Sequence, residues 1–343
     1  MNQDYNKNAL DVFRVIATVQ VFLGHIITHF VMERPPVDLV YFVRGVPILF
    51  VLCGFLAAKS LDKYKTIDWL KRRAARIIPG FWACIVVNTA VILLVYETRP
   101  SLIEAAIYGV TQFFGLNFYT GDWLRGYGVG TPNGVLWTIP VQIQFFLIAP
   151  FVYKLFRRSS LKLAGTIVAA LTLLSILLQR ASAFLPGIVT KVIGVTVLPY
   201  LYFLVAGMAG WCYRDKIIPA LQRAKWFVLI GYIIWKLAEI YLQFPHLLDG
   251  VLYNTVTTLL MAMLIFAFGF SFKWRMKADL SFGFYLYHMI FVYLAIHFGF
   301  KSLMPWWQGA VVLAVIVCAT ALFAWLSQRF VETPATKLLL RKG

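Results

Sequence analysis

Long apolar segments alternate with short, basic connections along almost the whole chain. A helix needs about 20 predominantly apolar residues to cross a bilayer. By this criterion we predict ten spans, at about residues 10–32, 39–58, 78–97, 134–153, 163–180, 190–212, 226–244, 250–271, 279–299 and 307–328. An eleventh apolar stretch, 101–119, carries Glu104 and an aromatic run, which is typical of a segment lying flat or re-entrant near the outer surface. The pattern therefore predicts an all-α integral membrane protein with one extra, non-spanning segment; if 101–119 does cross the membrane, the number of spans is eleven.

The composition agrees with this class. Of the residues, 61% are hydrophobic and 13% are charged, whereas a soluble domain is about half apolar and about a quarter charged. The net charge of +18 comes mostly from clusters in the connections, and these clusters share one side of the membrane if 101–119 does not span. Because short basic connections face the cytoplasm, we expect both termini there and no nucleic-acid partner. The clusters fall at residues 59–76, 154–162, 214–225, 273–277 and 337–342.

The length of the chain allows a single polytopic membrane domain, residues 1–343, without an appended soluble domain. The first apolar segment is too long for a signal-peptide core and lacks a cleavage site, so we expect it to remain as a span. The longest polar stretch, 119–134, is glycine-rich and predicts an outer loop, either a cover over a binding site or a plain connector. The four cysteines are scattered through apolar segments, which indicates neither a disulfide framework nor a metal site.

Two ionisable residues in the first apolar segment, Arg14 and His25, are eleven positions apart. Since an α-helix turns about 100° per residue, both side chains reach one face, roughly 16 Å apart along the axis. Ionisable groups at membrane depth usually face a polar cavity. The imidazole can exchange a proton, and the guanidinium can bind a phosphate, although Asp11, one turn earlier, can also neutralise it. The pair indicates a polar path entered from one side, which His29 can extend.

Six motifs follow one another along the chain. They are the Arg14–His25 pair, FVLCGFL at 50–56, RAARIIPGF at 73–81, LWTIPVQIQFF at 136–146, LSFGFYLYH at 280–288, and the triplet that begins at Glu332. In this order they resemble the acyltransferase-3 family of membrane O-acyltransferases. The resemblance implies transfer of an acyl group, expected to be acetyl, from cytoplasmic acetyl-CoA or another acyl-CoA. It implies a hydroxyl acceptor on a cell-surface or lipid-linked glycan, and a multi-pass protein of the bacterial inner membrane.

The resemblance also implies roles for the arginines. Arg14, Arg73 and Arg76 would hold the donor phosphates, with Arg72 beside them, and His25 would act as a general base or carry the acyl group transiently. Arg73 and Arg76 are three apart and share a helix face. A basic cluster beside the membrane also serves topology and contact with anionic lipid, so both interpretations stay open. We expect the helix that carries these arginines to end near Pro79.

Two positions depart from the family pattern. Gln142 stands where the family usually has a glutamate, and Cys53 where it usually has a serine. Glutamine cannot take up a proton or neutralise an arginine, so either the carboxylate is dispensable or the chain is a divergent or modified form. A pseudoenzyme that retains only coenzyme binding is one alternative. A transporter or flippase for a lipid-linked glycan is another, because a polar stripe also suits a substrate pathway.

The other ionisable and aromatic candidates each have two interpretations. Arg44 either anchors the outer interface or binds an acceptor sugar or phosphate, whereas Lys236 and Glu239, three apart, are expected to pair. Trp137 belongs to the aromatic belt or stacks on a sugar, and His288 either functions or bonds a neighbouring helix. The candidate residues besides the arginines and His25 are Asp11, Arg44, Cys53, Trp137, Gln142, His288 and Glu332, and we expect no metal.

Overall fold

In the residues that it describes, the computed structural model has helices as its only regular secondary structure, which confirms the all-α prediction. These residues are 5, 8–30, 40–116, 120–242, 250–272, 274, 276, 279–300 and 305–340. The predicted basic clusters at 273–277 and 337–342, the loop at 119–134 and the ends of several predicted spans lie partly outside them. The chain divides into two compact units. Unit 1 comprises residues 1–20, 41–66 and 144–277, and unit 2 comprises residues 21–40, 67–143 and 278–343.

Five of the described helical segments are long and apolar enough to cross a membrane. They contain α1 (Leu10–Phe30), α4 (Thr66–Val95), α6 (Thr138–Arg158), α7 (Leu161–Ala181) and α15 (Trp306–Ser327). Two bent helix pairs raise the number to seven if each pair is one span: α8 (Gly187–Gly194) with α9 (Leu201–Cys212), and α10 (Arg214–Arg223) with α11 (Lys225–Leu242). The remaining predicted spans coincide with the apolar helices α3 (Gly45–Leu61), α13 (Gly250–Phe268) and α14 (Ser281–His297). Helix length and composition therefore support five to seven spans, while ten spans and cytoplasmic termini stay predictions.

The segment predicted not to span forms a short helix, α5 (Leu102–Phe113). Its 12 residues rise only about 18 Å, too little for a bilayer core of about 30 Å. Glu104 has a local role, because its carboxylate accepts hydrogen bonds from the backbone N–H and the hydroxyl of Ser101, both at 2.8 Å. This capping box closes the amino end of α5. The length agrees with the predicted non-spanning segment, and its place at the outer surface stays a prediction.

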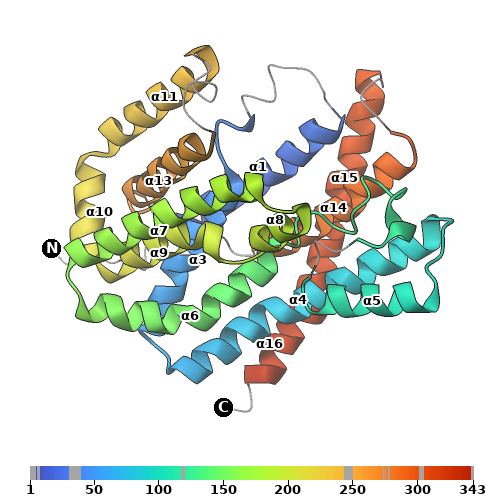
Figure 1. Cartoon of the computed structure of the whole chain (residues 1–343), viewed down its shortest axis with the longest axis horizontal. Coiled ribbons are helices and arrows are strands. Elements are labelled where there is room, and N and C mark those ends of the chain that lie inside the picture. The colour runs from blue at the N-terminus through green and yellow to red at the C-terminus, as the bar shows by residue number, and fades with distance from the viewer. Residues whose placement is uncertain are drawn as a thin grey trace. The chain divides into compact units, whose positions relative to one another are not determined.

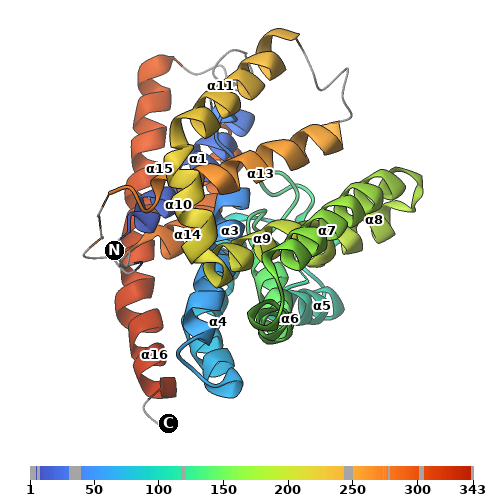
Figure 2. The same ribbon diagram turned by 90° about the vertical axis from the view of Figure 1, so that its left-hand side faces the viewer.

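Unit 1 is built around a close contact between α3 and α9 (Figure 1). A Cβ atom on Gly54 would lie 1.8 Å from the carbonyl oxygen of Leu204, and one on Gly207 would lie 2.1 Å from that of Val51. The two glycines therefore let the helix backbones touch, a common device between membrane helices. Helices α10 and α11 each contact α13 in the same unit (Figure 2). The glycine of the FVLCGFL motif thus serves helix packing.

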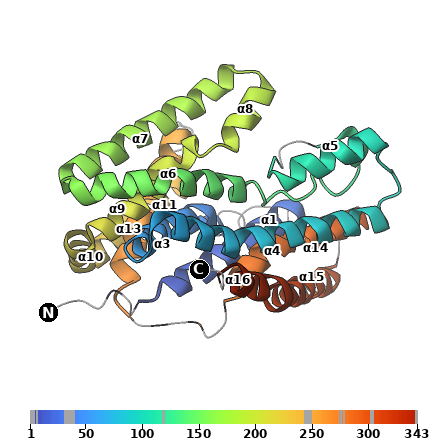
Figure 3. The ribbon, with the colours of Figure 1, turned by 90° about the horizontal axis from the view of Figure 1, so that it is seen from below.

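Unit 2 contains α4, α5, the helix pair α14–α15 and the carboxyl-terminal helix α16 (Thr333–Leu340). Helices α14 and α15 lie side by side (Figure 3). Between α15 and α16 runs a single π-helical segment, η4 (Gln328–Glu332). Such widened turns are rare and are often found at functional sites.

Pro79 does not end a helix, and that prediction is wrong. It lies inside α4, which continues to Val95. A helical proline removes the N–H that would bond the carbonyl four residues earlier, here Ala75. The Thr336 hydroxyl of α16 donates to that Ala75 oxygen at 3.1 Å. Because a neighbouring helix satisfies the freed carbonyl, the proline is tolerated within the apolar segment.

Candidate active site

Helix α1 is unbroken from Leu10 to Phe30, so Arg14 and His25 lie on one helix as predicted. Within unit 1, the Arg14 guanidinium pairs with Asp11 at 3.1 Å. The Asp11 carboxylate also accepts a hydrogen bond from the backbone N–H of Met276 at 3.3 Å. The local neutralisation of Arg14 that the sequence allowed is therefore present. A part for Arg14 in phosphate binding stays a prediction.

In unit 2, two other imidazoles lie close to that of His25. The His25 and His29 rings, one turn apart on α1, are stacked with centroids 6.1 Å apart and planes 8° apart. The His288 ring of α14 approaches His25 to a centroid distance of 5.6 Å. His25 and His29 are partly exposed, whereas His288 is fully buried. We call these three residues the histidine cluster; it holds the residue types needed for proton transfer or nucleophilic attack.

Inside the cluster, His288 is oriented by its own helix. Its Nδ1 lies 3.2 Å from the backbone oxygen of Phe284, and its Nε2 is buried with no hydrogen-bond partner among the described residues. The rings of Phe22 and Tyr285 flank it at centroid distances of 5.9 and 6.1 Å. The hydrogen bond of His288 Nδ1 stays within α14. It therefore does not match the predicted alternative, in which His288 bonds a neighbouring helix.

The described part of the glycine-rich loop is fastened to α14. Asn133 donates from its side-chain amide to the backbone oxygen of Leu286 at 3.0 Å. The hydroxyls of Thr131 and Tyr293 are 3.1 Å apart, and a Cβ on Gly134 would lie 2.7 Å from that Tyr293 oxygen. The glycine therefore permits a close approach that another residue would block. Sequence reasoning missed Tyr293 and Thr131. The only signal in the sequence was the glycines, which indicate that a loop can pack closely.

This attachment places the loop next to the histidine cluster within unit 2. The Tyr293 ring that binds the loop also contacts the His29 ring edge-on, with centroids 6.1 Å apart. Of the two interpretations left open for the loop, a cover beside a site fits better than a plain connector.

The arginine motif lies in the first turns of α4, also in unit 2. Arg72 and Arg76 are exposed, and the partly exposed Arg73 has its guanidinium 5.5 Å from the centre of the Trp69 ring. The 30 residues of α4 rise roughly 45 Å, so these arginines project from one end of the apolar part of the helix. A part for these arginines in binding the donor stays a prediction.

Glu332 of the terminal motif packs against the same helix. A Cβ on Gly80 would lie 3.2 Å from Glu332 Cγ. The Glu332 carboxylate accepts a hydrogen bond from Ser327 at 2.8 Å and lies near enough to Arg76 to interact electrostatically. Two motifs that are some 250 positions apart in the sequence thus form one part of unit 2.

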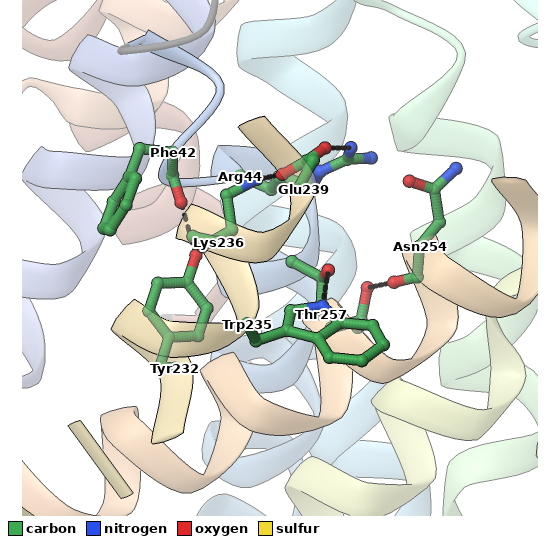
Figure 4. Close-up of polar contacts among 9 residues, drawn as sticks. Phe42, Arg44, Tyr232, Trp235, Lys236, Glu239, Asn254 and Thr257 are labelled. Atoms are coloured by element: carbon green, nitrogen blue, oxygen red, sulfur yellow. Dashed lines mark hydrogen bonds and ion pairs between the residues drawn. The ribbon is translucent and has the colours of Figure 1, made fainter. Parts of the chain in front are cut away.

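Arg44 belongs to a different group of side chains, in unit 1 (Figure 4). Its guanidinium is 3.9 Å from the Glu239 carboxylate, which also accepts a hydrogen bond from the almost fully buried Lys236. The predicted Lys236–Glu239 pair is confirmed. On the same helix, Tyr232 donates to the backbone oxygen of Phe42. Arg44 is therefore paired with a partly exposed carboxylate, and a part in acceptor binding stays a prediction.

The structure does not place the remaining candidates, Gln142, Trp137 and Cys53, in the histidine cluster. Gln142 is partly exposed near the start of α6, and its side chain forms no hydrogen bond with a described residue. Gln144, two positions later in unit 1, instead joins the backbone of Val195 and Val197 at 2.9 Å each. Trp137 is partly exposed just before α6, and Cys53 lies beside the packing glycine of α3.

Comparison with known proteins places this arrangement in the class of membrane acyltransferases. The model of the acyltransferase-3 family, described as an acyltransferase domain, matches residues 7–326. The chain therefore belongs to the acyltransferase-3 family, and the resemblance seen in the sequence is confirmed. Nodulation protein 10 of Rhizobium leguminosarum bv. viciae is 26% identical over 357 residues, covering 97% of this chain and 94% of the relative. No solved structure matches the chain significantly.

Proposed function

We propose that the protein transfers an acyl group, first of all acetyl, from acyl-CoA to a hydroxyl of a cell-surface or lipid-linked glycan. The observation that carries the proposal is the histidine cluster. His25 matches the family's first-helix motif and is a partly exposed imidazole in contact with two others. A loop of the kind that covers binding sites is fastened beside them.

The donor would bind through its phosphates. Arg72, Arg73 and Arg76 offer guanidiniums at the end of α4, and guanidinium is the side-chain group best suited to phosphate recognition. The family motif makes Arg14 a further proposed phosphate ligand; in unit 1 its guanidinium pairs with Asp11. The clustering of basic residues at this end supports a cytoplasmic donor side in the inner membrane of a bacterium.

The reaction replaces the thioester bond of the donor with an ester bond. In the direct route, His25 takes the proton of the acceptor hydroxyl while the hydroxyl oxygen attacks the acyl carbon; the carbon–sulfur bond breaks, and the proton passes to the coenzyme thiolate. In the two-step route, an imidazole nitrogen first attacks the acyl carbon, the carbon–sulfur bond breaks, and the coenzyme leaves as a thiolate that takes up the proton lost by the ring. The acceptor hydroxyl then attacks the acyl carbon, the carbon–nitrogen bond breaks, and the imidazole takes the hydroxyl proton. The second route moves the acyl group without the coenzyme.

The test is incubation of the purified protein with radiolabelled acetyl-CoA, with and without glycan prepared from the cell envelope. We expect coenzyme A release that depends on the glycan and is lost in His25→Ala. His297→Gln is the matched control, since this histidine bonds the Val95 carbonyl instead of joining the cluster, and it should retain transfer. Label on the peptide containing His25, found without glycan, selects the two-step route. Full transfer by His25→Ala would refute the proposal.

A further inference from the structure

His288, the buried histidine of the cluster, has one ring nitrogen in a hydrogen bond and one without a hydrogen-bond partner among the described residues. A backbone carbonyl can only accept, so the contact between His288 Nδ1 and the Phe284 oxygen, at 3.2 Å, assigns the hydrogen of a neutral His288 ring to Nδ1. Nε2 then carries a lone pair. This atom is completely buried and has no partner among the described residues. A buried acceptor without a donor loses its hydration without replacement and so destabilises the fold, which makes a functional reason for its position worth seeking.

The nearest ionisable ring is that of His25. The two ring centroids are 5.6 Å apart and the planes are inclined by 39°. A straight N–H···N bond of about 3.0 Å between two imidazoles separates their centroids by roughly 5.2 Å. The observed separation exceeds this by about 0.4 Å. Hydrogen bonds of catalytic groups are often longer without substrate and tighten when it binds.

The other neighbours of His288 leave this acceptor to His25. The Phe22 ring offers no donor, and the Tyr285 hydroxyl is engaged by Thr138 at 3.0 Å. His25 itself makes no hydrogen bond with any residue that the structure describes. A donor-capable ring thus lies next to the ring that carries the buried lone pair. Neither His25 nor His288 Nε2 forms a hydrogen bond with a residue that the structure describes.

We infer that His288 is a positioning residue for His25: its Nε2 accepts the N–H of His25 and thereby leaves a lone pair on the other His25 nitrogen, toward the reacting groups. The logic is that of any catalytic histidine whose second nitrogen is held by an acceptor, which fixes both tautomer and ring orientation. The His29 ring lies parallel to that of His25, with centroids 6.1 Å apart. This inference rests on the proposed role of His25 in acyl transfer.

Two substitutions separate positioning from packing. His288→Phe keeps an aromatic ring in a pocket of aromatic side chains but removes the acceptor. His288→Gln keeps an acceptor oxygen at nearly the distance of Nε2. We expect kcat for acetyl transfer to the envelope glycan to fall about 10- to 100-fold in His288→Phe, the usual worth of a group that orients a functional histidine, with the KM for acetyl-CoA within twofold. His288→Gln should recover most of the lost rate.

A spectroscopic readout tests the inference without turnover. In protein labelled with ¹⁵N-histidine and embedded in lipid, His25 is assigned by loss of its signals in His25→Gln. We expect a single His25 tautomer in the wild type and in His288→Gln, and a mixture in His288→Phe. If His288→Phe does not yield folded protein, His288→Leu takes its place.

The outcomes are distinguishable. An unchanged His25 tautomer and unchanged kcat in folded His288→Phe, or equal loss in the glutamine and phenylalanine variants, would overturn the positioning role. If His25→Ala abolishes transfer in the same experiment, the proposed function survives that result. If His25→Ala transfers normally, the proposed function fails and the inference fails with it.

Discussion

The contact between α3 and α9 gives the most direct quantitative prediction. In Gly54→Ala the new Cβ would sit 1.8 Å from the Leu204 carbonyl oxygen, and the atom in the way is backbone, which cannot rotate aside. To reach even 3.0 Å the two helices must separate by about 1.2 Å. Overpacking of this kind costs about 1–3 kcal/mol or more, while alanine in place of glycine returns roughly 0.5–1 kcal/mol in a helix. We therefore expect a net loss of about 1–2 kcal/mol of stability.

The assay is the temperature at which the detergent-solubilised protein loses its monodisperse peak in size-exclusion chromatography. Gly54→Ala should lower this midpoint, and Gly207→Ala, whose Cβ would meet Val51 at 2.1 Å, should lower it similarly. Since one separation of the helices relieves both clashes, the double variant should lose less than the sum. Gly165→Ala is the matched control, because nothing lies within 4 Å of its Cβ on α7, and it should be neutral or stabilising.

A midpoint for Gly54→Ala equal to that of the Gly165→Ala control would refute the reasoning. Strict additivity in the double variant would refute the idea that both glycines serve one contact.

Two further predictions concern the contacts of α4 with η4 and α16. Gly80→Ala places a Cβ 3.2 Å from Glu332, so it should displace that carboxylate and raise the KM for acetyl-CoA several-fold with little change in kcat; an unchanged KM would count against a donor site at this end of α4. Thr336→Val leaves the Ala75 carbonyl without its hydroxyl donor and should cost about 1–3 kcal/mol, seen as a lower thermal midpoint, whereas Thr336→Ser should match the wild type. Equal midpoints for the two Thr336 variants would contradict this account of Pro79.

Local periodicity was enough to predict how residues are arranged along one helix. Arg14 and His25 on α1, and the Lys236–Glu239 pair on α11, follow from the spacing of residues along a regular helix. The same local reasoning failed at Pro79, because the group that satisfies the freed carbonyl comes from a helix more than 250 residues later.

Contacts between distant segments could not be read from the sequence. His288 was a candidate because of its motif, yet nothing local placed its ring against His25. Arg44 was expected at an interface, and its contact with Glu239 on another helix was not foreseen. Helix pairing is decided by side-chain fit across the whole bundle, and a single sequence does not encode that fit in any short window.

The π-helical segment η4 acts as a one-residue phase shift in an otherwise regular helix. In an α-helix, residues five apart point well away from each other, whereas the i→i+5 pattern of a π turn stacks them. That stacking is why Ser327 is able to bond Glu332. Past the shift, every side chain is turned by roughly 100° from the face that the periodicity of α15 would assign to it. Glu332 and Thr336 thereby reach α4. A helical wheel drawn straight through residue 330 would point both of them in the wrong direction.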